Sequence, residues 1–500
     1  MPIPTRTFLA TLALWSTQAT LSIPGLRAQQ LDPTFHPPVF APLPGYTKPS
    51  VGNVVRQADG RYVVAGQFRA VDGHVTDCLA RLLADGNVDT TFTYRPAQSV
   101  TGQGGWTALA VQADGKVLAA LRTAAPLGSL RRILPSGRPD ASFQPALGSR
   151  PFGHSFGQIV VQPDGKLLLA GGITDSLGRN GLVRLLPTGR VDAAFNPPAL
   201  PANPGVLSVA LEPTGRMVYS RSSFDFSNPT TSVTRLLASG RVDSTFAFAL
   251  PPVSGGEQIA RIARCPDGSY ALAGWFANKA VAHITATGAW DGGFPLSVSC
   301  YAITVGLNIT NPIGALAVQP DGRVLVSGGL LTPAGNQASV IQTLSTGGMD
   351  ASFSPDFIYS PYQSTSTSAI YNDARVFDLL VEPGGKLLVA GQFVQAGLVY
   401  HTGLARLLPA APLATRGLAA GAAPMQVWPV PAHAQLNLAL PAGPLPQQVA
   451  LLDVAGRTVL AQEPKTATLT LYTAALPAGL YVLRVRHADG SVASRRVVLE

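Results

Sequence analysis

The chain has 500 residues, of which 46% are apolar and only 13% are charged, with 51 Gly and 43 Pro spread along it. This composition excludes an intrinsically disordered chain, and the frequent turns between short apolar runs indicate an all-β protein. The net charge of +9 does not indicate a nucleic-acid partner, because the basic residues stand singly beside turns, without dense runs or interleaved aromatics.

The first 28 residues have the features of a secretory signal peptide. Arg6 gives a positive start, Phe8–Trp15 an apolar stretch, and the tripeptide ending at Ala28 a small-residue cleavage site. This stretch is too short to span a bilayer, and no later segment approaches about 20 unbroken apolar residues, so we expect no transmembrane segment. Without Arg6 and Arg27 the mature chain has 34 basic and 27 acidic residues, a net charge of about +7.

A strand–turn–strand pattern then recurs along the chain. Val54–Phe68, Val160–Ile173 and Ala317–Leu330 each hold an apolar run, a tight turn, a basic residue and a second apolar run. The glycine of each turn occupies a position with positive φ, which indicates a β-hairpin. These turn glycines recur every 50 to 63 residues, at Gly60, Gly115, Gly165, Gly215, Gly268, Gly322 and Gly385. Such regular spacing predicts a repeat architecture.

A second strand–turn–strand follows each hairpin and ends in the pattern Asp-x-x-Phe, as in Leu79–Phe92 and Leu182–Phe195. Each repeat therefore supplies four short strands, the number in one blade of a β-propeller. The closing pattern occurs at Asp32/Phe35, Asp89/Phe92, Asp140/Phe143, Asp192/Phe195, Asp243/Phe246, Asp291/Phe294 and Asp350/Phe353.

The first closing pattern precedes the first hairpin, and the last hairpin has no closing pattern after it. We therefore predict that Leu31–Phe35 supplies the outer strand of the blade formed by about Arg375 to Leu408, and that this sharing closes a seven-bladed ring. An open solenoid would gain nothing from this offset and would need distinct caps. Nearly continuous apolar strands such as Leu167–Gly172 agree with blades that are covered on both faces.

The pattern VQPDGKLLLAGG followed by RLLPTGRVDAAF resembles the delta-60 repeat family of bacterial proteins, whose repeats are read as β-propeller blades. The resemblance covers about Leu31–Ala410; the third repeat matches closely, whereas the fifth is degenerate. It implies a surface or secreted protein and no defined activity.

After the last repeat the composition changes. Pro409–Pro424 is rich in Ala, Pro and Gly and has the character of a linker, and the remaining residues alternate as short strands around Gly turns, which suits a small β-sandwich. We therefore expect a signal peptide (1–28), a seven-bladed β-propeller (29–410), a linker (411–424) and a C-terminal β-sandwich (425–500).

The stretches DVAGRTV and LPAGLYVLRV resemble the type A C-terminal sorting domain of the type IX secretion system. The opening Trp428-Pro429-Val430-Pro431-Ala432 lacks the Asn usual in that family. The resemblance implies that residues 425–500 interact with the type IX machinery of a Gram-negative bacterium, and that the product is secreted or held at the outer-membrane surface. A surface peptidase commonly removes such a tail; the alternative is a stalk or binding module that stays in place.

No catalytic, cofactor or metal site is predicted, and we expect no cofactor. The seven His have no metal-ligand spacing, and the Asp-Gly dipeptides suit turns better than calcium loops. The cysteines Cys78, Cys265 and Cys300 are odd in number and form no CxxC, so we expect buried free thiols, with a Cys265–Cys300 disulfide as the alternative.

A basic residue recurs before the closing Asp of most repeats. It is Arg81, Arg132, Arg184, Arg235 and Arg406 in five of them, with His283 and Gln342 in the other two. Our hypothesis is that these residues pair with the repeated Asp and fix the blade edge, while the Phe fills the core between blades. The alternative is an exposed cationic ring.

Ligand contacts are expected where the repeats differ. The longest insertion, Ser354–Arg375, carries Tyr359, Tyr362 and Tyr371 among Ser and Thr, which suits a glycan or protein ligand; the next is Pro295–Pro312. The alternative for both is a tolerated surface loop.

These features favour a non-catalytic extracellular propeller that acts as a binding or adhesion scaffold. The alternative is an extracellular glycan lyase or hydrolase with its site in the central funnel of the ring. Against an enzyme stands the lack of a unique cluster of acids, histidines or metal ligands that breaks the repeat, although carboxylates from different blades could still meet.

Overall fold

The computed structural model describes most of the chain after the predicted signal peptide. The described residues are 30–46, 48–94, 106–121, 129–148, 155–200, 206–222, 231–249, 257–276, 279–295, 298–300, 303–305, 308–310, 313–332, 337–350, 352–353, 355, 357–358, 375–396, 399–409, 426–440, 445–453, 458–486 and 492–500. Over these ranges the chain forms strands and turns, and no helix with the length and hydropathy to cross a membrane. It divides into two compact units, residues 1–410 and 411–500.

In the first unit, each repeat forms three antiparallel strands that pair in chain order. In the first four repeats these are β2 (Ser50–Arg56), β3 (Tyr62–Gln67) and β6 (Leu79–Leu82); β7 (Trp106–Val111), β8 (Val117–Leu121) and β9 (Ser129–Ile133); β10 (Ser155–Val161), β11 (Leu167–Thr174) and β12 (Asn180–Leu185); and β13 (Val206–Leu211), β14 (Met217–Ser222) and β15 (Thr231–Leu236). In the later repeats they are β16 (Glu257–Arg264), β17 (Tyr270–Phe276) and β18 (Lys279–Ile284); β22 (Ile313–Val318), β23 (Val324–Leu331) and β24 (Gln337–Thr343); and β26 (Arg375–Val381), β27 (Leu387–Gln392) and β30 (Leu404–Leu407).

Short additional strands form in the segments that connect these strands. They are β1 (Phe40–Ala41), β4 (Ala70–Val71) and β5 (His74–Val75); β19 (Ser299–Cys300); β20 (Ile303–Val305) and β21 (Asn308–Thr310); and β25 (Phe357–Ile358), β28 (Gln395–Ala396) and β29 (Val399–Tyr400). The strand β19 pairs with both β18 and β23, so the fifth and sixth repeats share one continuous sheet.

The hairpin turns form where the glycines predicted them. Gly165 has φ 80°, a conformation that other residues adopt only with strain, and it joins β10 to β11. Gly66 has a different role: a Cβ there would lie 2.0 Å from the carbonyl oxygen of Ser50, so only glycine lets β3 approach β2 at this point.

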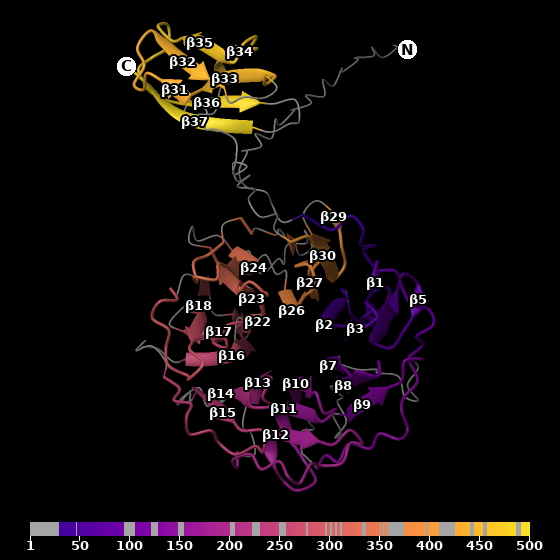
Figure 1. Ribbon diagram of the computed structural model, residues 1–500. Coiled ribbons are helices and arrows are strands. Elements are labelled where there is room, and N and C mark those ends of the chain that lie inside the picture. Colours follow the sequence, from indigo (N-terminus) through magenta and orange to yellow (C-terminus); the bar gives the residue numbers. More distant parts are fainter. Residues whose placement is uncertain are drawn as a thin grey trace, which may run out of the picture. The chain divides into compact units, whose positions relative to one another are not determined.

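The first strands of the repeats lie around a common centre (Figure 1). In chain order, β2 contacts β7, β7 contacts β10, β10 contacts β13, β13 contacts β16, β16 contacts β22 and β22 contacts β26. Because β26 in turn contacts β2, the path returns to its start. The first unit is therefore all-β and propeller-like.

Both faces of a sheet are buried against neighbouring repeats. In β8, Leu118 packs with Leu167 of the next repeat, whereas the adjacent Val117 packs with Val63 of the preceding one. Successive residues of a strand point to opposite faces, so a strand with two buried faces needs apolar residues at every position. This explains the continuous apolar runs in the sequence.

The first described residues pair with the last repeat, as the offset of the closing patterns predicted. Leu31 forms an antiparallel bridge with Leu407, and the amide of Asp32 donates to the carbonyl oxygen of Arg406 at 2.8 Å. The amide of Leu408 donates to the carbonyl oxygen of Gln30, also at 2.8 Å.

The expected fourth strand of each repeat is shorter than predicted. In the described residues it is reduced to a single bridge, as between Leu82 and Val88 in the first repeat. The closing Asp explains this, because Asp89 accepts a hydrogen bond from the amide of Thr91 two residues on and bends the chain away from the ladder.

The second unit consists of two antiparallel sheets. One holds β31 (Gln426–Trp428), β32 (Gln435–Ala439) and β35 (Thr468–Tyr472); the other holds β34 (Thr458–Gln462), β33 (Gln448–Leu452), β36 (Gly479–Arg486) and β37 (Val492–Leu499). Leu438 and Leu471 of the first sheet and Leu451 and Leu483 of the second belong to one buried cluster. The two sheets therefore share a core.

Candidate functional site

The repeated Arg and Asp form a clamp between neighbouring repeats. Nε of Arg184 lies 2.8 Å from Oδ2 of Asp192, and its Nη1 donates to the carbonyl oxygen of Ala238 in the next repeat at 2.6 Å. The guanidinium also lies 4.4 Å from the ring centre of Phe195. Both charged side chains are buried, so the pairing hypothesis is confirmed and the alternative of an exposed cationic ring is wrong.

The same clamp occurs in four other repeats. The Nε–Oδ2 distances are 2.8 Å in Arg81–Asp89, Arg132–Asp140 and Arg235–Asp243 and 2.9 Å in Arg406–Asp32. The last of these pairs joins the two ends of the unit, where Nζ of Lys386 also lies 2.7 Å from Asp32. In the sixth repeat Gln342 takes the place of Arg and donates to Asp350 at 2.8 Å.

The degenerate fifth repeat replaces the clamp with a hydrogen-bonded chain. Nδ1 of His283 lies 2.9 Å from Oδ2 of Asp291, and its Nε2 lies 2.9 Å from Oγ of Ser269. Although this order resembles a catalytic triad, Ser269 and His283 are buried, and the imidazole stacks on Phe294 with ring centres 4.9 Å apart. Ser269, His283 and Asp291 line neither of the two cavities in the described part of the first unit. We therefore interpret it as a substitute for the clamp.

The cysteines are buried free thiols, as predicted, and the alternative of a Cys265–Cys300 disulfide is wrong. Burial raises the pKa of Cys78 to about 11 and that of Cys300 to about 12. Both thiols are therefore protonated and unreactive at neutral pH.

The loop residues predicted to contact a ligand, Tyr359, Tyr362 and Tyr371, lie outside the described residues. Within the other insertion, Pro295–Pro312, the described residues form β19 and the β20–β21 hairpin. The candidate site therefore has to be sought elsewhere in the described part of the chain.

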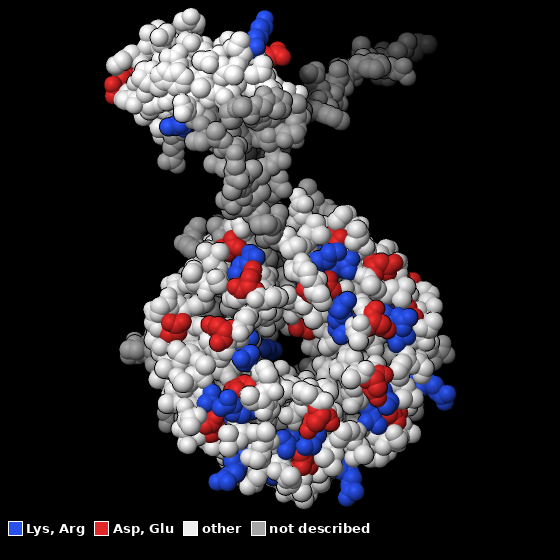
Figure 2. Space-filling model, in the orientation of Figure 1, with Lys and Arg blue, Asp and Glu red and all other residues white. Residues whose placement is uncertain are grey.

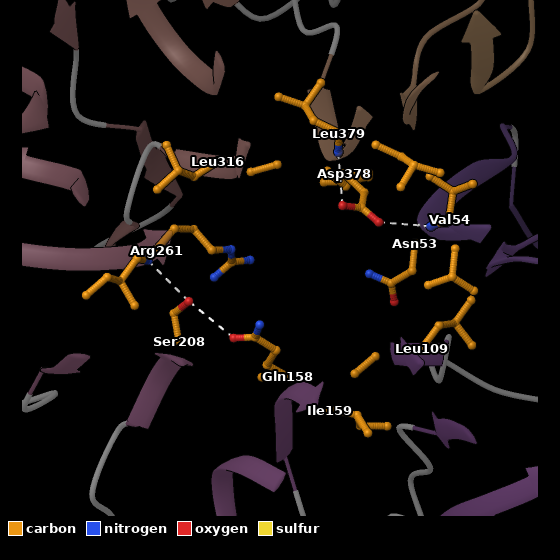
Figure 3. A pocket seen from close by; sticks show the side chains of 17 residues that line it. Asn53, Val54, Leu109, Gln158, Ile159, Ser208, Arg261, Leu316, Asp378 and Leu379 are labelled. Carbon is orange, nitrogen blue, oxygen red and sulfur yellow. Dashed lines mark hydrogen bonds between the residues drawn. The ribbon is translucent and has the colours of Figure 1, made fainter. Parts of the chain in front are cut away.

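A cavity of about 270 Å³ lies at the centre of the first unit, between the first strands of the repeats. Figure 2 shows the opening at this centre, and Figure 3 shows the side chains around the cavity. Each repeat contributes the residue that stands seven positions before its turn glycine, at the point where the first strand shifts register. These seven residues are Asn53, Ala108, Gln158, Ser208, Arg261, Ala315 and Asp378.

Three of these side chains receive hydrogen bonds from the next repeat. Oε1 of Gln158 accepts from the amide of Val209 at 2.8 Å, and Oγ of Ser208 accepts from the amide of Ile262 at 3.2 Å. Oδ2 of Asp378 accepts from the amide of Val54 at 2.9 Å (Figure 3). These side chains satisfy backbone donors and so hold neighbouring first strands together.

Two other side chains have no such role. Oδ1 of Asn53 is buried and has no hydrogen-bond partner among the residues that the structure describes. Arg261 donates from Nη1 to the carbonyl oxygen of Ala260 at 3.0 Å, but within the described part of the chain no carboxylate oxygen lies within 4.0 Å of its nitrogens. Figure 3 shows both side chains pointing into the cavity from opposite sides.

The cavity disfavours charge, yet it holds one residue of each sign. Burial lowers the pKa of Arg261, although the negative charge of Asp378 opposes this shift. Burial likewise raises the pKa of Asp378, against the hydrogen bonds from the amides of Val54 and Leu379 and the charge of Arg261. The carboxylate is thus partly satisfied by backbone donors, whereas most of the guanidinium donors face the cavity.

Sequence reasoning missed this site, although a signal was present. Aligning the repeats on their turn glycines and reading seven positions back gives Asn, Ala, Gln, Ser, Arg, Ala and Asp, while the turn and the closing Asp recur. The seven positions are about 50 residues apart in the chain, and only the circular arrangement brings them together.

A second cavity of about 370 Å³ lies in the first repeat, between the β4–β5 hairpin and the closing pattern. Its lining includes His74 and Tyr94, together with Arg81 and Asp89, which form one of the clamps. Because these two charges already satisfy each other, the central cavity is the better candidate for binding.

Two known domain families match this chain. A β-propeller described as a domain of unknown function (DUF5122) matches residues 57–92 and 162–195, and a secretion system C-terminal sorting domain matches residues 426–500. The protein thus combines a DUF5122 β-propeller with a type IX sorting domain, as the resemblances implied. It is exported by the type IX system and is secreted or held at the cell surface.

Among solved structures, the chain is similar to PorZ, a surface component of the type IX secretion system of Porphyromonas gingivalis, at 10% identity over 90% of this chain and 86% of that one, with a TM-score of 0.19. It is also similar to a protein of unknown function from Dyadobacter fermentans, at 15% identity over 62% of this chain and 98% of that one, with a TM-score of 0.31. A third is the calcium-binding protein regucalcin from Agrobacterium tumefaciens, at 17% identity over 59% of this chain and 87% of that one, with a TM-score of 0.33. At these TM-scores the similarities carry no argument, and no curated protein matches the chain.

Proposed function

We propose that this protein is a non-catalytic binding scaffold, displayed on or released from the bacterial surface, whose central cavity receives the ligand. In this proposal residues 29–410 form a seven-bladed propeller closed by Leu31–Phe35. Residues 1–28 are a cleaved signal peptide and 411–424 a linker. Residues 425–500 form a β-sandwich that engages the type IX machinery.

The observation that carries this proposal is the contrast between the frame and the cavity. The hairpin turn and the closing Asp recur in all seven repeats and the Arg–Asp clamp in five, whereas the seven cavity positions hold six different residue types. In three repeats the side chain at this position also accepts a hydrogen bond from a backbone amide of the next repeat, whereas Asn53 and Arg261 make no such bond among the described residues. Different residues at the equivalent cavity position of each repeat suit the recognition of an asymmetric ligand.

The alternative, a glycan lyase or hydrolase in the central funnel, is less well supported. Glycoside hydrolases generally use two carboxyl groups flanking the bond that breaks. Among the described residues that line the cavity, Asp378 is the only carboxylate, and two backbone amides already bind it.

The test is a glycan array run together with an activity screen on the purified full chain. Saturable binding without turnover supports the scaffold, and turnover of any bound glycan supports the enzyme. Two variants locate the site: Arg261→Met alters the cavity, and the combined Tyr359→Ala, Tyr362→Ala and Tyr371→Ala change alters the long insertion. Binding that only the tyrosine variant abolishes places the ligand on the loop and contradicts a site in the cavity.

A further inference from the structure

We infer that the central cavity binds a small hydroxylated carboxylic acid, of the size and chemistry of an acidic monosaccharide, with its carboxylate on Arg261. This inference rests on the proposed binding function and specifies its ligand. It follows from comparing the residues that occupy one position in each repeat.

The frame does not require an arginine at this position. Ala108 and Ala315 stand at the equivalent places in two other repeats, where a methyl group suffices. Gln158 and Ser208 accept backbone hydrogen bonds there, which a guanidinium cannot do because it has no acceptor. Arg261 therefore contributes nothing that the neighbouring repeats obtain from this position.

Keeping a guanidinium in the cavity also has a cost. Arg261 is half-buried, and a charge partly removed from water is unfavourable unless it is paired and hydrogen-bonded; burial accordingly lowers its pKa. The nearby Asp378 does not supply a direct pair, because its Oδ2 and Oδ1 accept from the amides of Val54 and Leu379, each at 2.9 Å. The free donors of Arg261 thus lack the anion that they would bind best.

A carboxylate fits these donors because a guanidinium presents two parallel N–H groups to its two oxygens. Oδ1 of Asn53, which points into the cavity from the other side, has no donor within the described ranges, and a ligand hydroxyl would supply one. The aliphatic side chains of Leu109, Ile159 and Leu316 complete the lining and suit the C–H faces of a sugar ring. The volume of about 270 Å³ admits a ligand smaller than the drug-sized molecules that fill pockets of about 300–1,000 Å³.

Isothermal titration calorimetry on the full chain tests this inference with D-glucuronate and with D-glucose, which has the same ring and no carboxylate. We expect glucuronate to bind at least about 10-fold more tightly than glucose, because a charge-assisted bidentate contact contributes this much. Sulfate, an anion without hydroxyl donors, should bind more weakly than glucuronate.

The variant Arg261→Met should weaken glucuronate binding by about 10- to 100-fold. Arg261→Lys keeps the charge but lacks the two parallel N–H donors of the guanidinium, and it should weaken binding less. Arg264→Met is the matched control, because Arg264 is exposed three residues further along β16 and should leave the affinity unchanged. Thermal unfolding of each variant verifies that it is folded. Comparing glucuronate with glucose on the unaltered protein requires no variant at all.

Equal affinity for glucose and glucuronate, or no binding of glucuronate, overturns the inference. So does glucuronate binding that Arg261→Met leaves intact in the folded variant. The proposed function survives these results if the glycan array still yields a ligand that binds without turnover. It fails separately if the array yields none, or if a bound glycan is cleaved.

Discussion

Replacing Arg184 with Met removes one clamp and keeps much of the apolar stem of the side chain. Asp192 then stays buried without its guanidinium partner, and the carbonyl oxygen of Ala238 loses a donor. Removing one partner of a buried ion pair costs about 3–5 kcal/mol. Lys166, whose Nζ lies 3.7 Å from Asp192, and the amide of Ala194 remain as partners, so we expect the lower end, about 3 kcal/mol.

Differential scanning calorimetry of the full chain measures this effect. A unit of about 380 residues has an unfolding entropy of about 0.8 kcal/mol/K, so a loss of about 3 kcal/mol lowers its melting temperature by about 4 °C. The control is Arg190→Met, the same substitution at an exposed arginine of the same repeat, which should change the melting temperature by less than about 1 °C. If Arg184→Met melts like the unaltered protein, the clamp does not stabilise the fold and the reasoning is refuted.

Four further predictions concern acid stability, closure, the cavity and export. Hydrogen bonds from Thr245 lower the pKa of Asp243 to about 2, against the opposing effect of burial. Its contribution to stability is therefore complete above about pH 5 and is lost as the pH falls toward 2, and melting temperatures recorded across this window should decline. Asp32→Ala should release the N-terminal segment from the last repeat, so a protease should cleave near residues 30–35 sooner than in the unaltered protein, and equal cleavage rates would argue against the closure. Arg261→Met should keep or raise the melting temperature, since it removes a desolvated charge; a clear decrease would show that the frame needs this arginine. Deleting residues 426–500 should retain the protein inside the cell, and immunoblots that still find it in the medium or on the surface would contradict the role of the tail.

The frame of the first unit could be predicted because its signals are local and repeated. Gly165 predicts a hairpin because the turn needs a positive φ, which glycine adopts without strain. The spacing between Arg184 and Asp192 places them on adjacent segments of one repeat. The pairing of Leu31 with Leu407 could also be predicted, because the count of hairpins and closing patterns left one of each without its partner. The fourth strand was predicted too long, since the bend at the closing Asp depends on hydrogen bonds that an apolar pattern does not reveal.

The cavity could not be predicted by the same means. Asn53, Arg261 and Asp378 lie far apart in the chain, and although each stands seven residues before a turn glycine, their proximity follows only from the closure of the ring. Two backbone amides bind Asp378, whereas none binds Arg261. Both residues stand where their first strand shifts register. The apolar pattern of a strand does not reveal such a one-residue shift.

The most direct test of a binding site at the centre of the ring is a crystal structure of the full chain grown with D-glucuronate. We predict difference density in the central cavity, with the carboxylate of the ligand within hydrogen-bond distance of Arg261 and a hydroxyl on Oδ1 of Asn53. Ligand density on the 354–375 insertion with an empty cavity would contradict the account.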